Sequence, residues 1–250
     1  MSFIFISGRP GTGKTTLAAS MTKLGYKVLF LDVDQKINQM MNIHHLVESG
    51  MIQVIPITEK LTESTLEKKV LHPNLALLKE PKGYLSIVRE IDKLEQLTEP
   101  HECQVFVLDS LTSSVEHLKR LISHLNKKTK FSFDEWGDLL ANLEELFYSL
   151  MRLQNIAFKH VIVLAHEMTE KDEDTGSIIS ILPAIEGSMR NKVGKYFAES
   201  YRTVVEVNKQ GEAKYFIHTK PMNKAEARTS RDLPPIVGAD FSIIFKEEIK

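Results

Sequence analysis

Short apolar runs alternate with amphipathic segments along most of the chain. The runs predict buried strands, because a strand covered on both faces is almost continuously apolar. They span residues 3–6, 26–31, 52–57, 105–108, 161–165 and 241–245. Apolar residues spaced three apart, as at Leu85, Val88, Ile91 and Leu94, predict amphipathic helices between the strands. The helices are expected over residues 16–23, 40–47, 85–97, 113–126, 138–155 and 185–199.

Turn residues predict the remaining segments. Charges and prolines break the periodicity from residue 58 to 81, so a variable connection with at most a short helix is expected there. Residues 202–207 and 213–219 flank the sequence Asn-Lys-Gln-Gly-Glu and predict a β-hairpin, whereas 168–182 is either a mobile loop or a short hairpin. The alternation of strands and helices indicates an α/β fold. We expect one domain over residues 1–250, with a mostly parallel central sheet flanked by helices and a C-terminal antiparallel hairpin.

Charge and cysteine content narrow the class of protein. The formal net charge of −1 argues against a globally basic nucleic-acid-binding protein but leaves local basic surfaces open. The lone cysteine, Cys103, argues against a disulfide framework and fits a reducing compartment. No apolar run approaches the ~20 residues that cross a bilayer. We therefore expect a cytoplasmic protein without a membrane partner.

The sequence from Gly8 to Thr15 matches the phosphate-binding P-loop pattern G-x-x-x-x-G-K-[ST]. It lies between a predicted strand and a predicted helix, the context in which this pattern binds phosphate. Glycines let backbone N–H groups face phosphate oxygens, Lys14 reaches the β- and γ-phosphates, and the Thr15 hydroxyl can ligate Mg²⁺. The predicted cofactors are therefore ATP and Mg²⁺. The predicted nucleotide-binding residues are Gly8, Arg9, Pro10, Gly11, Thr12, Gly13, Lys14, Thr15 and Thr16.

Two acidic residues follow predicted strands at the edge where the P-loop is expected. Asp109 ends an apolar run in the manner of a Walker B strand and is expected to hold Mg²⁺ through water or the Thr15 hydroxyl. The predicted metal ligands are thus Thr15 and Asp109. Hydrolysis also needs a base that orients the attacking water. Asp34, just beyond the second strand, is the best candidate, because Asp109 is followed by Ser110 rather than by a glutamate.

Several absences restrict the class of P-loop protein. No Asn-Lys-x-Asp or Thr-Lys-x-Asp sequence follows a strand, which argues against a guanine-specific GTPase. The glutamate that follows the Walker B aspartate in AAA+ enzymes is missing. Residues 168–184 contain no arginine, which argues against a small-molecule kinase with an arginine-rich lid.

The motifs follow a recognisable order. Leu-Asp-Val-Asp ends the second strand at 31–34, Val-Leu-Asp-Ser ends the Walker B strand at 107–110, and Leu-Ala-His ends a later strand at 164–166. Together with the P-loop, this order resembles the RecA-like ATPase core. In that family the second strand ends in Asp-x-Glu, whose Glu polarises water, and the later strand ends in a residue that senses the γ-phosphate. The resemblance implies catalytic roles for Lys14, Asp34, Asp109 and His166.

Motifs outside the nucleotide site allow a narrower comparison. The P-loop itself has the form G-x-P-G-T-G-K-T-T. Further along the chain, Glu-Trp-Gly stands at 135–137, and Lys-Ala-Glu-Ala-Arg at 224–228 precedes Leu-Pro at 233–234. Over nearly the whole chain these resemble the compact phage RecA-like single-strand annealing ATPases. The resemblance implies an Mg-dependent ATPase in a host cytoplasm that binds single-stranded DNA. It also implies annealing or strand exchange together with a single-strand-binding protein.

The same resemblance indicates which residues would contact DNA and a neighbouring subunit. RecA-like proteins hold DNA in the loops after the Walker B helix and after the sensor strand, here 127–137 and 167–190. The first loop combines lysines with aromatic residues, which suits phosphate attraction and base stacking, whereas residues 170–174 of the second are acidic. The predicted DNA contacts are Lys127, Lys128, Lys130, Phe133, Trp136, Arg190 and Lys192. Arg228 corresponds to a cation that acts on a neighbour's nucleotide, which implies a homo-oligomer, either a ring or a filament.

Two other functions fit the same nucleotide site. The first is a P-loop kinase that phosphorylates a nucleotide or small metabolite with Asp32 or Asp34 as the base. The second is a regulatory RecA-like ATP switch, resembling the circadian-clock branch, that binds a protein partner.

Overall fold

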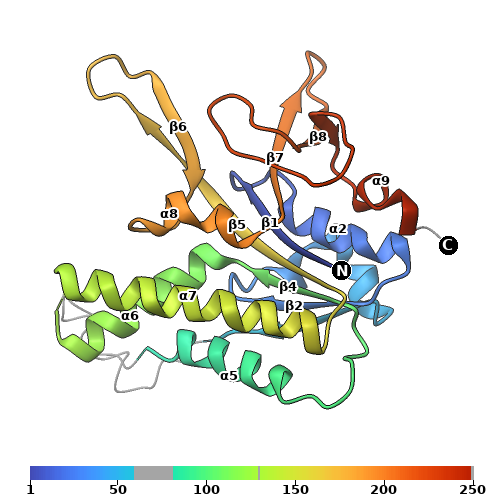
Figure 1. Ribbon diagram of the computed structural model, residues 1–250. Coiled ribbons are helices and arrows are strands. Elements are labelled where there is room, and N and C mark those ends of the chain that lie inside the picture. The colour runs from blue at the N-terminus through green and yellow to red at the C-terminus, as the bar shows by residue number, and fades with distance from the viewer. Residues whose placement is uncertain (59–80, 129, 249–250) are drawn as a thin grey trace.

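One central sheet organises the computed structural model of the protein (Figure 1). Residues 1–58, 81–128 and 130–248 are described, so the predicted connection over 58–81 lies almost entirely outside the described residues. The strands are β1 (Ser2–Gly8), β2 (Val28–Asp32), β3 (Ile52–Pro56), β4 (Val105–Asp109), β5 (His160–Lys171), β6 (Ile178–Pro183), β7 (Glu199–Val207), β8 (Ala213–His218) and β9 (Ile236–Gly238). Their order across the sheet is β3-β2-β4-β5-β1-β7-β8-β9, with β6 paired to β5 outside this row.

Most of these strands run parallel. The pairs from β3 across to β7 are all parallel, whereas β8 pairs antiparallel with both β7 and β9. The β7–β8 pair is the predicted C-terminal hairpin. The expected α/β fold with a mostly parallel sheet and an antiparallel C-terminal edge is therefore confirmed.

The hydrophobic core lies on both faces of the sheet, because neighbouring residues of a strand point to opposite sides. In β1, Phe3 and Phe5 face one layer of helices, and Ile4 and Ile6 face the other. All seven residues of this strand are buried. This two-sided burial explains why the central strands are continuously apolar in sequence.

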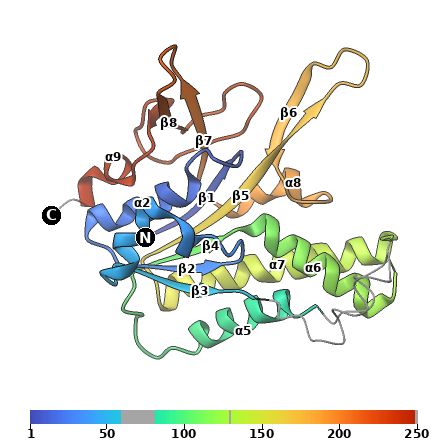
Figure 2. The same ribbon diagram turned by 180° about the vertical axis from the view of Figure 1, so that it is seen from behind.

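Helices cover each face of the sheet (Figures 1 and 2). One face packs against α5 (Gly83–Glu95), α6 (Leu111–Asn126) and α7 (Phe133–Ile156). The other face packs against α1 (Lys14–Ala19), α2 (Met41–Glu48) and α9 (Phe241–Ile244). The shorter turns are η1 (Ser20–Leu24), η2 (Ile37–Gln39), α8 (Met189–Lys192), η3 (Val193–Tyr196) and η4 (Lys246–Glu248). Among the described residues, no helix is long and apolar enough to cross a membrane.

Two hairpins project from the same edge of the sheet (Figure 1). The first half of β5 is buried between β1 and β4, whereas its second half leaves the sheet and pairs antiparallel with β6. The segment 168–182 is therefore a hairpin, one of the two expected forms. The other projecting hairpin is β7–β8.

The prediction of a strand at 241–245 was wrong. Phe241, Ile244 and Phe245 are buried together at helical spacing against the layer that contains α1 and η1. Asp240 caps this turn, because its carboxylate accepts a hydrogen bond from the Ser242 N–H at 2.9 Å. A short apolar run fits either a strand or a helix in sequence. Here the Asp240 cap favours the helix.

Two helix predictions also needed correction. The expected helix over 185–199 is reduced to α8 and η3, because Gly187 adopts a left-handed φ of 68° and Phe197 is extended. Phe197 instead stacks on Phe3 with ring centroids 4.3 Å apart. Helix α7 begins at Phe133 rather than at residue 138, because Ser132 and Glu135 form a capping box.

Candidate nucleotide-binding site

The predicted site residues meet at one edge of the sheet. In the strand register, Asp32 pairs with Asp109, and Gly8 pairs with His166. The carboxyl ends of β1, β2, β4 and β5 therefore lie together, as expected for a ligand site of an α/β protein. A pocket of about 1050 Å³ opens there. It is lined by the P-loop, by residues 33–36 and by the first turns of α6.

The P-loop backbone needs glycine at defined positions. Gly11 and Gly13 have φ values of 80° and 85°, a region that side chains disfavour. Gly8 is required for a different reason, since a Cβ there would lie 2.1 Å from the Thr203 hydroxyl of β7. These glycines hold the loop in a conformation that can turn N–H groups toward an anion.

Lys14 is buried beneath the loop. Its Nζ donates to the carbonyls of Gly8 and Arg9, at 2.8 and 3.0 Å, and lies 3.3 Å from Nδ1 of His166. Burial lowers the pKa of Lys14 to about 8, helped by the charge of Lys36 and opposed by nearby carboxylates. An ammonium with so few water contacts is suited to exchange carbonyl partners for phosphate oxygens.

We expect nucleotide binding to weaken as pH rises through about 8. The free protein loses the Lys14 ammonium in this range, because its pKa is lowered to about 8, whereas bound phosphates favour the protonated form. Binding above this pH should therefore take up protons. Calorimetry in two buffers of different ionisation enthalpy measures that uptake. Binding heats that do not depend on the buffer between pH 8 and about 9.5 would contradict the assignment.

Thr15 and Asp109 form the predicted metal-binding pair. The Thr15 hydroxyl donates to Oδ2 of Asp109 at 2.7 Å, and the Asp109 side chain is fully buried. Burial raises the pKa of Asp109, although Lys36 and the Thr15 hydroxyl favour its charged form. Hydroxyl and carboxylate oxygens suit Mg²⁺, which keeps several waters and phosphate oxygens as further ligands. In the described part of the chain, no three or more His, Cys, Asp or Glu side chains form a group that could hold a metal ion.

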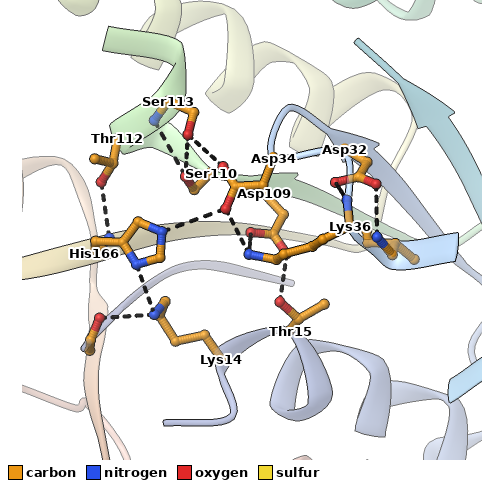
Figure 3. A network of polar contacts seen from close by, with 12 residues as sticks. Lys14, Thr15, Asp32, Asp34, Lys36, Asp109, Ser110, Thr112, Ser113 and His166 are labelled. Atoms are coloured by element: carbon orange, nitrogen blue, oxygen red, sulfur yellow. Dashed lines mark hydrogen bonds and ion pairs between the residues drawn. The ribbon is translucent and has the colours of Figure 1, made fainter. Parts of the chain in front are cut away.

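Asp34 lies at the centre of a network of hydrogen bonds (Figure 3). Its Oδ1 accepts hydrogen bonds from the hydroxyls of Ser110 and Ser113, at 2.9 and 2.5 Å. Its Oδ2 accepts from Lys36 at 2.7 Å and lies 3.5 Å from Nε2 of His166. Burial opposes the charge, but the hydrogen bonds from His166, Lys36 and Ser113 hold the pKa of Asp34 far below its usual range. These contacts favour the ionised carboxylate, which can accept hydrogen bonds from the donors around it.

His166 links the P-loop lysine to this acid. Its ring lies between Lys14 and Asp34, with one nitrogen toward each (Figure 3). The His166 backbone N–H donates to the Thr112 hydroxyl at 2.9 Å, which ties the middle of β5 to α6. A role for His166 in sensing the γ-phosphate stays a prediction.

Sequence reasoning did not identify Lys36 or Ser113 as site residues. Lys36 belongs to the turn after β2, in which the carboxylate of Asp32 accepts the N–H groups of Lys36 and Ile37. The sequence Asp-Val-Asp-Gln-Lys carried a weak signal, namely a cation two residues after the candidate base. Whether this cation reaches Asp109 depends on the pairing of β2 with β4, which the sequence alone does not reveal.

Arg228 is not part of the pocket in its own chain. Its guanidinium donates to the carbonyls of Gly194 and Phe197, and its backbone bridges to Ser200. Ser200 pairs with Phe5 in the middle of β1, away from the P-loop end of the strand. A role at the nucleotide of a neighbouring subunit stays a prediction.

In the first predicted DNA segment, residues 127–137, some side chains are exposed and others are packed or paired. Phe133 is 90% exposed at the start of α7. Trp136 instead packs against the core cluster, with its ring 5.1 Å from that of Phe131. Lys128 is paired with Glu135 at 2.7 Å. The exposed Lys127 ends α6 in a left-handed conformation.

The second segment lies beside the first. The backbone of Gly187 faces the Trp136 ring, and Lys119 of α6 is 2.5 Å from Glu186. Arg190 approaches Glu170 of the acidic hairpin at 4.0 Å, whereas Lys192 is exposed. The structure thus brings the two predicted segments together, with their positive charges partly compensated.

Fold and site together define a P-loop domain with a RecA-like α/β fold, in which one strand separates the P-loop strand from the strand that carries Asp109. The family model described as AAA domain matches residues 3–231, and the chain therefore belongs to this family. Among solved structures, the crystal structure of the RadB recombinase aligns over 87% of each chain, with 15% identity and a TM-score of 0.45. No curated protein matches the chain.

Proposed function

We propose that this protein is an Mg-dependent ATPase that binds single-stranded DNA and promotes annealing or strand exchange. The observation that carries the ATPase assignment is the network that joins Thr15, Asp109 and Asp34 beside Lys14. In a P-loop fold these groups correspond to the metal-binding pair, the water-orienting acid and the phosphate-binding lysine.

Each group has a defined task in the proposed reaction. The P-loop N–H groups and Lys14 bind the phosphates, and Thr15 with Asp109 would hold Mg²⁺, which neutralises charge on the β- and γ-phosphates when bound. Asp34 accepts a hydrogen bond from the attacking water and orients it. His166 lies between Lys14 and Asp34, so it can report a change at the γ-phosphate to the acid and to β5.

The DNA part of the proposal rests on the two adjacent segments. Lys127, Lys130 and Lys192 are exposed cations, and Phe133 presents an exposed ring close in sequence to the first two. Lysines attract the phosphate backbone, and an aromatic ring stacks on unpaired bases without sequence preference. Trp136 is packed inward and is better suited to hold Gly187 in place than to stack on a base.

Replacing Lys127, Lys130 and Lys192 together by alanine should weaken single-stranded DNA binding and flatten its salt dependence. The slope of log K against log salt should fall by about 2, because each phosphate contact contributes ~0.7. Fluorescence anisotropy with a labelled oligonucleotide at several salt concentrations measures both effects. The matched control replaces Lys23, Lys27 and Lys93, exposed lysines elsewhere on the surface. An equal loss in the control would contradict this location, and no DNA affinity at low salt, with or without ATP, would contradict the function.

Assembly is the remaining part of the proposal. A ring or filament of this chain would allow Arg228 to leave the Gly194 and Phe197 carbonyls and reach a neighbour's γ-phosphate. A single-strand-binding protein is the expected partner on DNA. Light scattering with ATP and DNA tests the assembly, and a monomer under all conditions would exclude the trans role.

A phosphotransferase is the second candidate function. The pocket continues past Ser113 along α6 to Glu116, His117 and Arg120, which leaves room for an acceptor beyond the phosphates. Arg120 supplies an arginine that the 168–184 segment lacks. Transfer of labelled γ-phosphate to a small acceptor rather than to water would favour this candidate over the ATPase. Binding of ATP without any turnover would favour a regulatory switch.

A further inference from the structure

Lys36 brings a second ammonium group to the nucleotide site. Its Nζ lies 2.7 Å from Oδ2 of Asp34 and 3.2 Å from Oδ1 of Asp109. Both carboxylates are buried or nearly so, whereas the Lys36 side chain is 35% exposed. Lys36 therefore joins the proposed water-orienting acid to the proposed metal-binding acid, and it also lines the pocket (Figure 3).

The position of Lys36 is fixed by its turn. The carboxylate of Asp32 accepts the N–H groups of Lys36 and Ile37, at 3.3 and 3.0 Å. Gln35 adopts a left-handed φ of 55°, and its side chain donates to the Ile57 carbonyl at 2.7 Å. The N–H groups that precede it, of Val33 and Asp34, donate to the Asp109 carbonyl. The backbone thus aims Lys36 at the two acids.

A divalent cation held by Asp109 would share this carboxylate with Lys36. Thr15 donates to Oδ2 of Asp109, and Lys36 donates to Oδ1. A metal ion held by Thr15 and Asp109 would stand close to the Lys36 ammonium in a buried setting, where like charges repel strongly. The lysine side chain is long and flexible, so its ammonium can withdraw toward the open pocket and the phosphates.

We propose that Lys36 is a positioning residue that neutralises Asp34 and Asp109 until Mg²⁺ and nucleotide arrive, and then yields Asp109 to the metal. This inference rests on the proposed Mg–nucleotide function. In the empty site, Lys36 holds the carboxylates of Asp34 and Asp109 in place. Its departure from Asp34 on metal binding frees an oxygen of that carboxylate for the attacking water. The Mg²⁺ concentration that the site needs is accordingly set by competition with Lys36.

The test compares wild type with Lys36→Met, which keeps the length of the side chain but removes its charge. Mg²⁺ is titrated at a fixed concentration of a non-hydrolysable ATP analogue, and the thermal unfolding midpoint and the fluorescence of a labelled nucleotide are followed. For Lys36→Met the Mg²⁺ concentration at half-effect should fall about tenfold, the size expected when one charge-assisted hydrogen bond no longer competes. Nucleotide binding in excess chelator should become weaker, because a cation that attracts phosphate is lost.

These two opposite shifts distinguish competition from a merely structural role. Lys36→Arg should restore the wild-type Mg²⁺ dependence, and Lys27→Met, which removes a surface partner of Glu102, should leave both measurements unchanged. An unchanged or higher Mg²⁺ requirement in Lys36→Met overturns the inference while the nucleotide site stands. Parallel weakening with and without Mg²⁺ overturns it as well. A wild-type protein without any Mg-dependent nucleotide binding overturns the proposed function itself.

Discussion

Replacing Lys14 by alanine should weaken ATP binding at least ~100-fold, which corresponds to the loss of about 3 kcal/mol from charge-assisted hydrogen bonds to phosphate. Lys14 is 5% exposed, and its ammonium spans the P-loop carbonyls and His166. The Thr12 hydroxyl also donates to the Arg9 carbonyl, but it carries no charge that could attract phosphate. Equilibrium titration with a fluorescent nucleotide measures the effect.

The control for this prediction is Lys23→Ala. Lys23 follows the same helix in the adjoining turn η1 but pairs at the surface with Asp240, and neither side chain lines the pocket. Its nucleotide affinity should equal that of wild type. An ATP affinity of Lys14→Ala within a few-fold of wild type would show that the P-loop does not bind the triphosphate in the expected manner.

Replacing Asp34 by asparagine should reduce ATP turnover by roughly 100- to 1000-fold, the size expected when an oriented base is lost. The amide is similar in size to the carboxylate, and its oxygen can still accept from Ser110 and Ser113. Nucleotide affinity should therefore change little. The expected result is a fall in turnover with an almost unchanged Kd, which single-turnover phosphate release and equilibrium binding measure separately.

Asp92→Asn serves as the matched control for Asp34→Asn. Asp92 is an exposed residue of α5 and does not line the pocket. The variant should hydrolyse ATP at the wild-type rate. If Asp34→Asn loses affinity and turnover in equal proportion, Asp34 acts in binding, and the water-orienting role must pass to another group.

The sequence predicted the parts of the site that depend on local pattern. The P-loop, Asp34, Asp109 and His166 each follow an apolar run, and parallel strands bring such positions to one edge. The structure places all of them there, within one network.

What the sequence did not reveal depends on contacts between distant segments. Lys36 reaches the site only because β2 pairs with β4 in this register. The charge of Lys128 is compensated by Glu135, which belongs to the capping box of α7. The helix at 241–244 was mistaken for a strand because its apolar residues fit either period over so short a run. The contacts of Trp136 with Phe131 and Gly187 also join separate segments, so the sequence could not show that its ring packs inward in this chain.

The place of β1 in the sheet has a consequence for the order of folding. This strand lies between β5 and β7, so its partners are contributed by residues roughly 160 and 200 positions further along the chain. At ribosomal rates of 5–20 residues per second, β1 waits about 10–40 s for its second edge to be covered. During that time a strongly apolar strand has open edges, and pairing over such separations is slow. The P-loop that follows β1 is therefore completed late, after most of the chain has been made.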